Sequence, residues 1–238
     1  QKDPAKRFPT ATHLLAMLEP PGPLGPQPLV GRDLEVLVLS ERVIRCAGGS
    51  GGVVLVTGAN GMGKSRMAKV AVDVAKRCDI FAIRTHAAAS DLPLGAFDRL
   101  FDALAAGGMS GPRQLAEALR GGKVDRHVVY STYRNLLIGQ RGNPRLLLLD
   151  DFQLLDPSSW DLLQYLIRNT VTLAEQAVLW VVTADPTVEE EKIQRFKELF
   201  RPVQIILDPL SVEAVEELLA SLVGDSPAAR VLAHRIHQ

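Results

Sequence analysis

The sequence predicts an α/β fold in which helices cover both faces of a five-stranded, mainly parallel β-sheet. Two observations predict it. Short, continuous apolar segments indicate buried strands, and each alternates with a longer segment of helical pattern. The 238 residues are 47% hydrophobic and 23% charged, which is typical of a globular protein rather than a disordered one. Such alternation implies that the strands pair in parallel through right-handed crossovers.

Each element follows from its residues in chain order. The strands are expected at 53–57, 80–85, 146–149, 178–183 and 203–207. The helices are expected at 33–46, 64–76, 95–106, 113–139, 158–169, 188–199, 211–223 and after Pro227. The first strand follows a glycine-rich turn, four leucines form the third, and the glycine pairs at 107–108 and 121–122 interrupt the helices around them.

Two short segments come before this region. Residues 1–19 indicate a small helix, because Thr10 is a candidate N-cap ahead of a run of good helix formers. Residues 20–28 hold five prolines in nine positions, which excludes a helix and indicates a linker. We therefore expect a core at 29–208 and a helical segment at 209–238. Since the chain starts with Gln1 and stops inside a helical pattern, we expect it to be part of a longer protein.

Composition argues against several classes of protein. There are 27 basic and 27 acidic residues, so the net charge is zero and a nucleic-acid partner is not expected. Two cysteines do not make a disulfide framework, which favours a reducing, cytoplasmic location. No apolar run approaches the ~18 residues of a membrane span, so no membrane partner is expected.

Residues 58–65 carry the clearest motif. They match G-x-x-x-x-G-K-[ST] at every fixed position, between an expected strand and an expected helix. Lys64 can reach the β- and γ-phosphates of a nucleotide, and Ser65 can ligate Mg²⁺. The alternative is a glycine-rich turn that binds nothing. The residues expected to bind nucleotide here are Gly58, Ala59, Asn60, Gly61, Met62, Gly63, Lys64, Ser65 and Arg66.

A second acidic motif follows the third expected strand. Four leucines lead directly into Asp150 and Asp151, which places Asp150 at the carboxyl edge where open parallel sheets bind ligands. We expect Asp150 to hold Mg²⁺ and Asp151 to orient or deprotonate the attacking water. The alternative for Asp151 is a cap on the next turn.

With both motifs in place, residues 29–223 resemble the signal-transduction ATPases with numerous domains (STAND), within the AAA+ group. Val30, Gly31 and Arg32 look like the family's N-terminal motif near the adenine, and Pro209 looks like the adenine-contacting proline at the start of the helical lid. The resemblance implies a P-loop NTPase three-layer sandwich. It also implies ATP/ADP and Mg²⁺ as cofactors and an ATP-driven switch in a bacterial signalling protein.

The sequence departs from the family pattern at two places. Gln153 and Leu154 stand where the family has His-Trp, and Asp185 stands at about the position of an arginine that senses the γ-phosphate. Thr183 could still donate a hydrogen bond as a catalytic residue. The departures argue against fast hydrolysis more than against nucleotide binding. Two alternatives therefore stay open: a non-hydrolysing nucleotide-bound scaffold and an origin-recognition-like, DNA-associated AAA+ ATPase.

The first residues resemble a different family. The segment 2–11, with the leucines that follow it, is similar to the C-terminal end of a bacterial Ser/Thr protein kinase domain, in which the arginine matching Arg7 anchors an ion pair. An ordinary capped surface helix is the alternative. The resemblance implies a kinase domain upstream, a sensor or repeat region downstream and a nucleotide-dependent oligomer as partners. No kinase catalytic residue lies in this chain.

Overall fold

A computed structural model describes residues 29–88, 93–105, 125–138, 144–171, 177–224 and Ala233. The described residues fall into two units: Arg32–Pro209, and the flanking residues up to Gly31 together with those from Leu210. The expected helix and linker at 1–28 and the helical segment after Pro227, apart from Ala233, lie outside the described residues. No described helix is long and apolar enough to cross a membrane.

The unit Arg32–Pro209 is built on a five-stranded sheet, as predicted. Its strands are β1 (Gly52–Thr57), β2 (Phe81–His86), β3 (Arg145–Asp150), β4 (Val178–Ala184) and β5 (Val203–Ile206). They lie in the order β2-β3-β4-β1-β5, and every pair of neighbours is parallel. β4 lies between β1 and β3. Because these three strands are parallel, their carboxyl ends lie at the same edge of the sheet.

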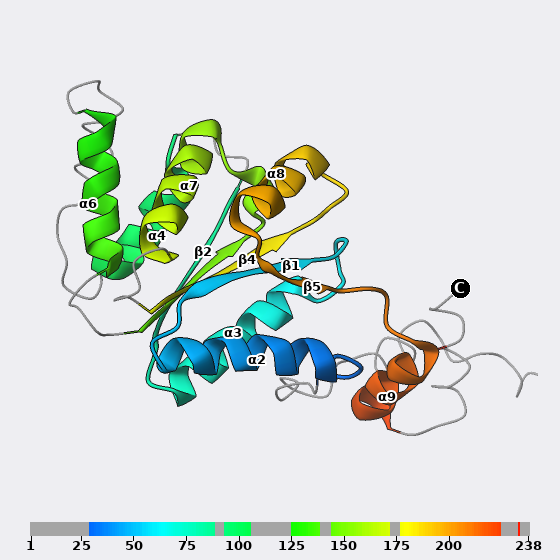
Figure 1. The fold of residues 1–238 in the computed structure, drawn as a ribbon. Helices are drawn as coiled ribbons and strands as arrows, with labels where there is room; N and C mark the ends of the chain where they lie inside the picture. The colour runs from blue at the N-terminus through cyan, green and yellow to red at the C-terminus, as the bar shows by residue number, and fades with distance from the viewer. Residues whose placement is uncertain are drawn as a thin grey trace, which may run out of the picture. The chain divides into compact units, whose positions relative to one another are not determined.

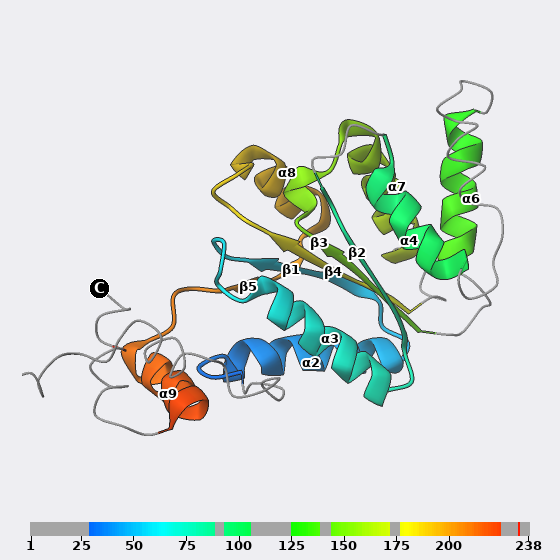
Figure 2. The same cartoon turned by 180° about the vertical axis from the view of Figure 1, so that it is seen from behind.

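Helices cover both faces of this sheet, which confirms the three-layer prediction (Figures 1 and 2). One face carries α2 (Asp33–Ala47) and α3 (Lys64–Arg77). The opposite face carries α4 (Gly95–Ala105), α6 (Arg126–Ile138), α7 (Pro157–Val171) and α8 (Glu190–Phe200). In the other unit, α9 (Val212–Val223) follows its N-cap Ser211, whose hydroxyl accepts the N–H of Ala214 at 3.2 Å.

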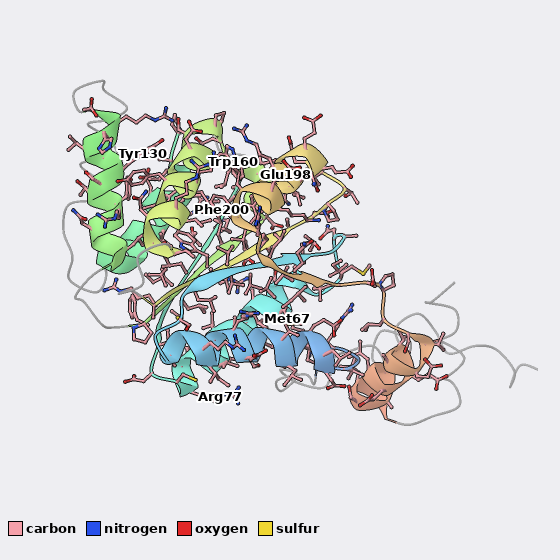
Figure 3. All side chains as sticks on the ribbon, viewed as in Figure 1. Met67, Arg77, Tyr130, Trp160, Glu198 and Phe200 are labelled. Carbon is pink, nitrogen blue, oxygen red and sulfur yellow. The ribbon has the colours of Figure 1, made fainter. Side chains whose placement is uncertain are left out.

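The two faces of the sheet bury different side chains. The buried side of α3 carries the small residues Ala68, Ala71 and Ala75 beside the larger Met67, so this helix packs closely on the sheet. On the opposite face an aromatic cluster joins α7 to α8, with Phe152 5.8 Å from Trp160 and 4.9 Å from Phe196 between ring centroids. Figure 3 shows Met67 on one side of the sheet and Tyr130, Trp160 and Phe200 on the other.

Local signals set where the helices begin. Gly63 precedes α3 with a left-handed φ of 96°, and Asp156 precedes α7 with a carboxylate that accepts the N–H groups of Ser158 and Ser159, each at 3.0 Å. The predicted bounds agree with these elements to within two residues. The exception is the helix expected at 113–139, of which the structure describes α6 alone, residues 106–124 lying outside the described part.

Candidate functional site

The loop between β1 and α3 is shaped by its glycines. A Cβ atom on Gly58 would lie 2.9 Å from the carbonyl oxygen of Leu207, so a side chain does not fit there. Gly61 and Gly63 have φ angles of 84° and 96°, a region that other residues adopt only at a cost. The loop therefore approaches the chain after β5 closely and then turns into the N-terminus of α3, where the helix dipole favours an anion.

The amine of Lys64 lies inside this loop. The residue is 8% exposed, and its Nζ donates hydrogen bonds to the carbonyl oxygens of Gly58 at 2.8 Å and Ala59 at 3.0 Å. The next residue, Ser65, is exposed. The lysine is thus held where a phosphate would meet the loop, and the serine hydroxyl lies at the first turn of α3.

Asp185, one residue after β4, faces the same lysine. Its Oδ2 lies 3.9 Å from Lys64 Nζ, and its Oδ1 accepts the hydroxyl of Thr187 at 2.7 Å and the N–H of Thr187 at 3.0 Å. The pKa of Asp185 is lowered, first by the Thr187 side chain and backbone and further by the charge of Lys64. The carboxylate is therefore ionised and paired with the lysine that is expected to bind phosphate.

Asp150, Asp151 and Thr183 form one hydrogen-bonded group. The Thr183 hydroxyl donates to Asp150 Oδ1 at 3.1 Å and accepts the backbone N–H of Asp151 at 3.0 Å. Asp151 has a left-handed φ of 54° and leads into a 3-10 turn (Phe152–Leu154) that the sequence did not predict. Gln153 Nε2 donates to Asp151 Oδ1 at 3.3 Å. Thr183 thus positions both aspartates: its hydroxyl hydrogen holds the Asp150 carboxylate, and its hydroxyl oxygen holds the Asp151 backbone.

Arg84 belongs to the site although the sequence did not single it out. It lies on β2, and its Nε donates to Asp150 Oδ2 at 2.7 Å while its Nη2 lies 2.5 Å from the same oxygen. A hollow of 430 Å³ is lined by Ser65, Arg84, Thr85, His86, Asp150 and Asp151. The parallel pairing of β2 with β3 brings Arg84 to Asp150. The sequence did not reveal this pairing, because it depends on the order of the strands in the sheet.

The donor atoms around this hollow suit Mg²⁺. Ser65 supplies a hydroxyl oxygen and Asp150 a carboxylate, which are hard oxygen ligands that line one space. The described residues contain no group of three or more His, Cys, Asp or Glu side chains that could hold a metal by themselves. Mg²⁺ accepts this arrangement, since it usually takes one or two protein ligands and completes its shell with water and phosphate oxygens.

The residues expected near the adenine lie in two units. Within one, the buried Arg32 donates to the carbonyl oxygen of Asp208, next to Pro209, and to Glu35 at 3.1 Å. Within the other, Gly31 has a φ of 65°, and a Cβ atom there would lie 2.7 Å from that of Ala214. Val30 is buried. The adenine-binding role of these residues stays a prediction.

A model of the AAA ATPase domain family matches residues 28–182, which is more than half of the chain. The chain belongs to the AAA ATPase domain family. This assignment confirms the AAA+ part of the predicted resemblance, and it agrees with the P-loop and acidic motifs already described at the carboxyl edge of the sheet.

Solved structures share the fold of this AAA ATPase domain. Drosophila ORC bound to DNA has a TM-score of 0.64 at 17% identity, over 99% of this chain and 58% of that one. The Aeropyrum pernix ORC1 protein in complex with DNA scores 0.58 at 19% identity, over 88% and 56%. AMPPCP-bound DnaA from Aquifex aeolicus scores 0.52 at 16% identity, over 79% and 50%. The chain thus spans about half the length of these neighbours.

No curated protein matches the sequence significantly. The predicted residues Lys64, Ser65, Asp150, Asp151 and Thr183 lie together at the sheet edge. Arg84 is the arginine that lines the hollow.

Proposed function

We propose that this AAA ATPase domain is an ATP-binding and slowly ATP-hydrolysing switch module of a multidomain bacterial signal-transduction protein. One observation carries the proposal: Ser65 of the phosphate-binding loop and the aspartate pair after β3 line a single hollow. Lys64 lies next to that serine at the N-terminus of α3. A nucleoside triphosphate with its cation requires an anion-binding loop and a metal-binding carboxylate at one edge.

The chain's own residues would divide the work of hydrolysis. Lys64 would exchange the carbonyl oxygens of its loop for the β- and γ-phosphates, and Ser65 and Asp150 would hold Mg²⁺, which when bound offsets phosphate charge. Asp151 would orient a water molecule toward the γ-phosphorus and accept its proton. The bond from that phosphorus to the β–γ bridging oxygen breaks, releasing ADP and phosphate. Thr183 keeps both aspartates in place.

The finer parts of the proposal concern the whole protein. A kinase domain before residue 20 and a sensor or repeat region after residue 238 would be the domains that the switch connects. The ion pair of Arg32 with Glu35 and its bond to the Asp208 carbonyl link the start of α2 to the residue before Pro209. Because Arg32 is expected near the adenine, a change at the nucleotide would reach the chain at Pro209, where the expected lid begins. A nucleotide-dependent oligomer is part of the same proposal.

The binding site is tested by Lys64→Ala. Calorimetric titration with ATP and Mg²⁺ should show affinity weakened by more than about tenfold, since charge-assisted hydrogen bonds to phosphate are lost. Lys69→Ala is the matched control, because Lys69 is an exposed lysine on the same helix. Unchanged ATP affinity in the Lys64 variant, with a normal melting temperature, would refute the assignment of the site.

A non-hydrolysing nucleotide-bound scaffold is the second candidate, and Asp185 favours it. Asp185 stands where the family resemblance implies an arginine that senses the γ-phosphate, so a positive charge that would stabilise the terminal phosphate during hydrolysis is replaced by a negative one. Phosphate release by the unaltered protein, compared with Asp151→Asn, separates the two candidates. Release that exceeds the level of the Asp151 variant supports the switch, and equal background levels with intact ATP binding support the scaffold.

A further inference from the structure

The ion pair of Arg84 with Asp150 joins a strand at the sheet's edge to the carboxylate expected to hold Mg²⁺. Both contacts from the guanidinium end on the same oxygen, Asp150 Oδ2, while Oδ1 receives the Thr183 hydroxyl. Both oxygens of this buried carboxylate therefore have partners from the chain. A cation at Oδ2 competes with the guanidinium, because two positive charges at one oxygen repel each other.

The arginine is much more exposed than the aspartate that it contacts. The Arg84 side chain is 44% exposed and that of Asp150 is 6% exposed. Arg84 borders the 430 Å³ hollow together with Ser65, which is expected to ligate the same Mg²⁺ as Asp150. A guanidinium displaced from Asp150 would remain beside this hollow, next to the place where the phosphate oxygens of the bound nucleotide would lie.

The charges of the residues around the hollow favour Arg84 as a partner for phosphate oxygens. Asp185 places a negative charge beside Lys64 where the family resemblance implies an arginine. Among the residues that line the hollow, Asp150 and Asp151 are acidic and Arg84 is the one lysine or arginine. A guanidinium presents a fork of donors that matches phosphate oxygens, whereas a lysine presents a point charge.

We propose that Arg84 binds the terminal phosphate of ATP once Mg²⁺ has taken Asp150, and so makes the site prefer ATP to ADP. The proposal rests on the proposed function, since it assumes that Mg²⁺ and nucleotide bind at this edge. In the nucleotide-free protein Arg84 neutralises Asp150, and with Mg·ATP the same guanidinium neutralises the γ-phosphate. ADP lacks that phosphate, so it gains nothing from Arg84.

The test is calorimetric titration of the full 238-residue chain with ADP and with a non-hydrolysable ATP analogue, in Mg²⁺ and in EDTA. In Mg²⁺, Arg84→Gln should weaken binding of the analogue about tenfold and leave ADP affinity within about twofold, because one charge-assisted bidentate contact is lost. Arg84→Lys should give an intermediate loss, since the charge remains and the fork does not. In EDTA, Arg84→Gln and the unaltered chain should discriminate equally little.

Arg126→Gln is the matched control, because it also removes an arginine–aspartate pair, Arg126–Asp161 at 2.6 Å, but lies outside the hollow. It should leave both affinities unchanged. Unchanged discrimination in Arg84→Gln, or in Arg84→Lys should the first variant not fold, would overturn the role of Arg84 alone. Tighter binding of both nucleotides would also overturn it, because Arg84 would then only block Asp150. An unaltered chain that binds neither nucleotide would overturn the proposed function itself.

Discussion

Asp185 places a carboxylate beside Lys64, the lysine that is expected to bind phosphate. Asp185 is 6% exposed, and Thr187 hydrogen-bonds it in its ionised form. In a poorly hydrated place the repulsion between this charge and a phosphate is screened less than it would be in water. We therefore expect Asp185 to oppose nucleotide binding, because it repels phosphate and pairs with Lys64.

Replacing Asp185 by asparagine should raise ATP affinity. The variant keeps the shape and removes the charge, so we expect about three- to tenfold tighter binding of Mg·ATP by calorimetry. Hydrogen bonds from the Thr187 side chain and backbone, together with the charge of Lys64, hold the pKa of Asp185 below its ordinary value. The group is thus ionised throughout the neutral range, and the gain should be the same at about pH 6 and pH 8. Asp161→Asn is the control, and an affinity that falls or stays equal in Asp185→Asn contradicts the prediction.

At the scale of single elements, α8 depends on its aromatic contacts. Phe196 is fully buried between Phe152, Trp160 and Phe200, with ring centroids 4.9, 6.2 and 5.0 Å away. The other side of the helix carries charged and mostly exposed residues. The attachment of α8 to the sheet therefore comes from one apolar side.

Phe196→Ala should lower the free energy of unfolding by about 3–5 kcal/mol, because it removes a large side chain and leaves a cavity. Urea unfolding followed by circular dichroism measures this loss. Leu199→Ala on the same helix is the control: Leu199 is 37% exposed, and we expect a loss below about 1 kcal/mol. Similar losses in the two variants would show that the aromatic cluster does not stabilise α8.

The acidic end of β3 shows how far an element could be predicted. Four leucines ahead of Asp150 predicted that this residue lies at the carboxyl edge of the strand, and in the structure it is the last residue of β3. The 3-10 turn after it depends on the left-handed backbone of Asp151. Aspartate tolerates that conformation but does not require it, so the residue type alone did not predict the turn.

For the molecule as a whole, similarity of fold does not decide what the domain binds. The neighbours with DNA in their structures, Drosophila ORC and Aeropyrum pernix ORC1, share less than a fifth of their residues with this chain. The net charge of this chain is zero. An electrostatic footprint for the phosphate backbone is therefore not expected from overall charge.

We predict no salt-dependent binding of duplex DNA by this chain. Fluorescence anisotropy with a labelled duplex at about 50 mM and 200 mM salt measures it, because phosphate contacts would appear as affinity that falls steeply with salt. The measurement should include Mg·ATP. Affinity that is strong at low salt and lost at high salt would favour the origin-recognition-like alternative over the signalling switch.

The sequence by itself determined the α/β class, the five strands and the two motifs of the candidate nucleotide site. These features are local: a buried strand, a glycine-rich loop and a helix start are each set by a few neighbouring residues. Lys64, Ser65 and Asp150 could be assigned in this way. Their roles follow from residue type and from position at the end of a strand.

Only the tertiary structure decided which strands are neighbours, and with them the partners of the charged groups. The placement of β2 beside β3 brings Arg84 onto Asp150, and the ends of β1 and β4 bring Asp185 to Lys64. These pairs join residues 66 and 121 positions apart in the chain (150 less 84, and 185 less 64). The order of strands in a sheet arises from packing and crossover connections, so local sequence does not record which charges will meet.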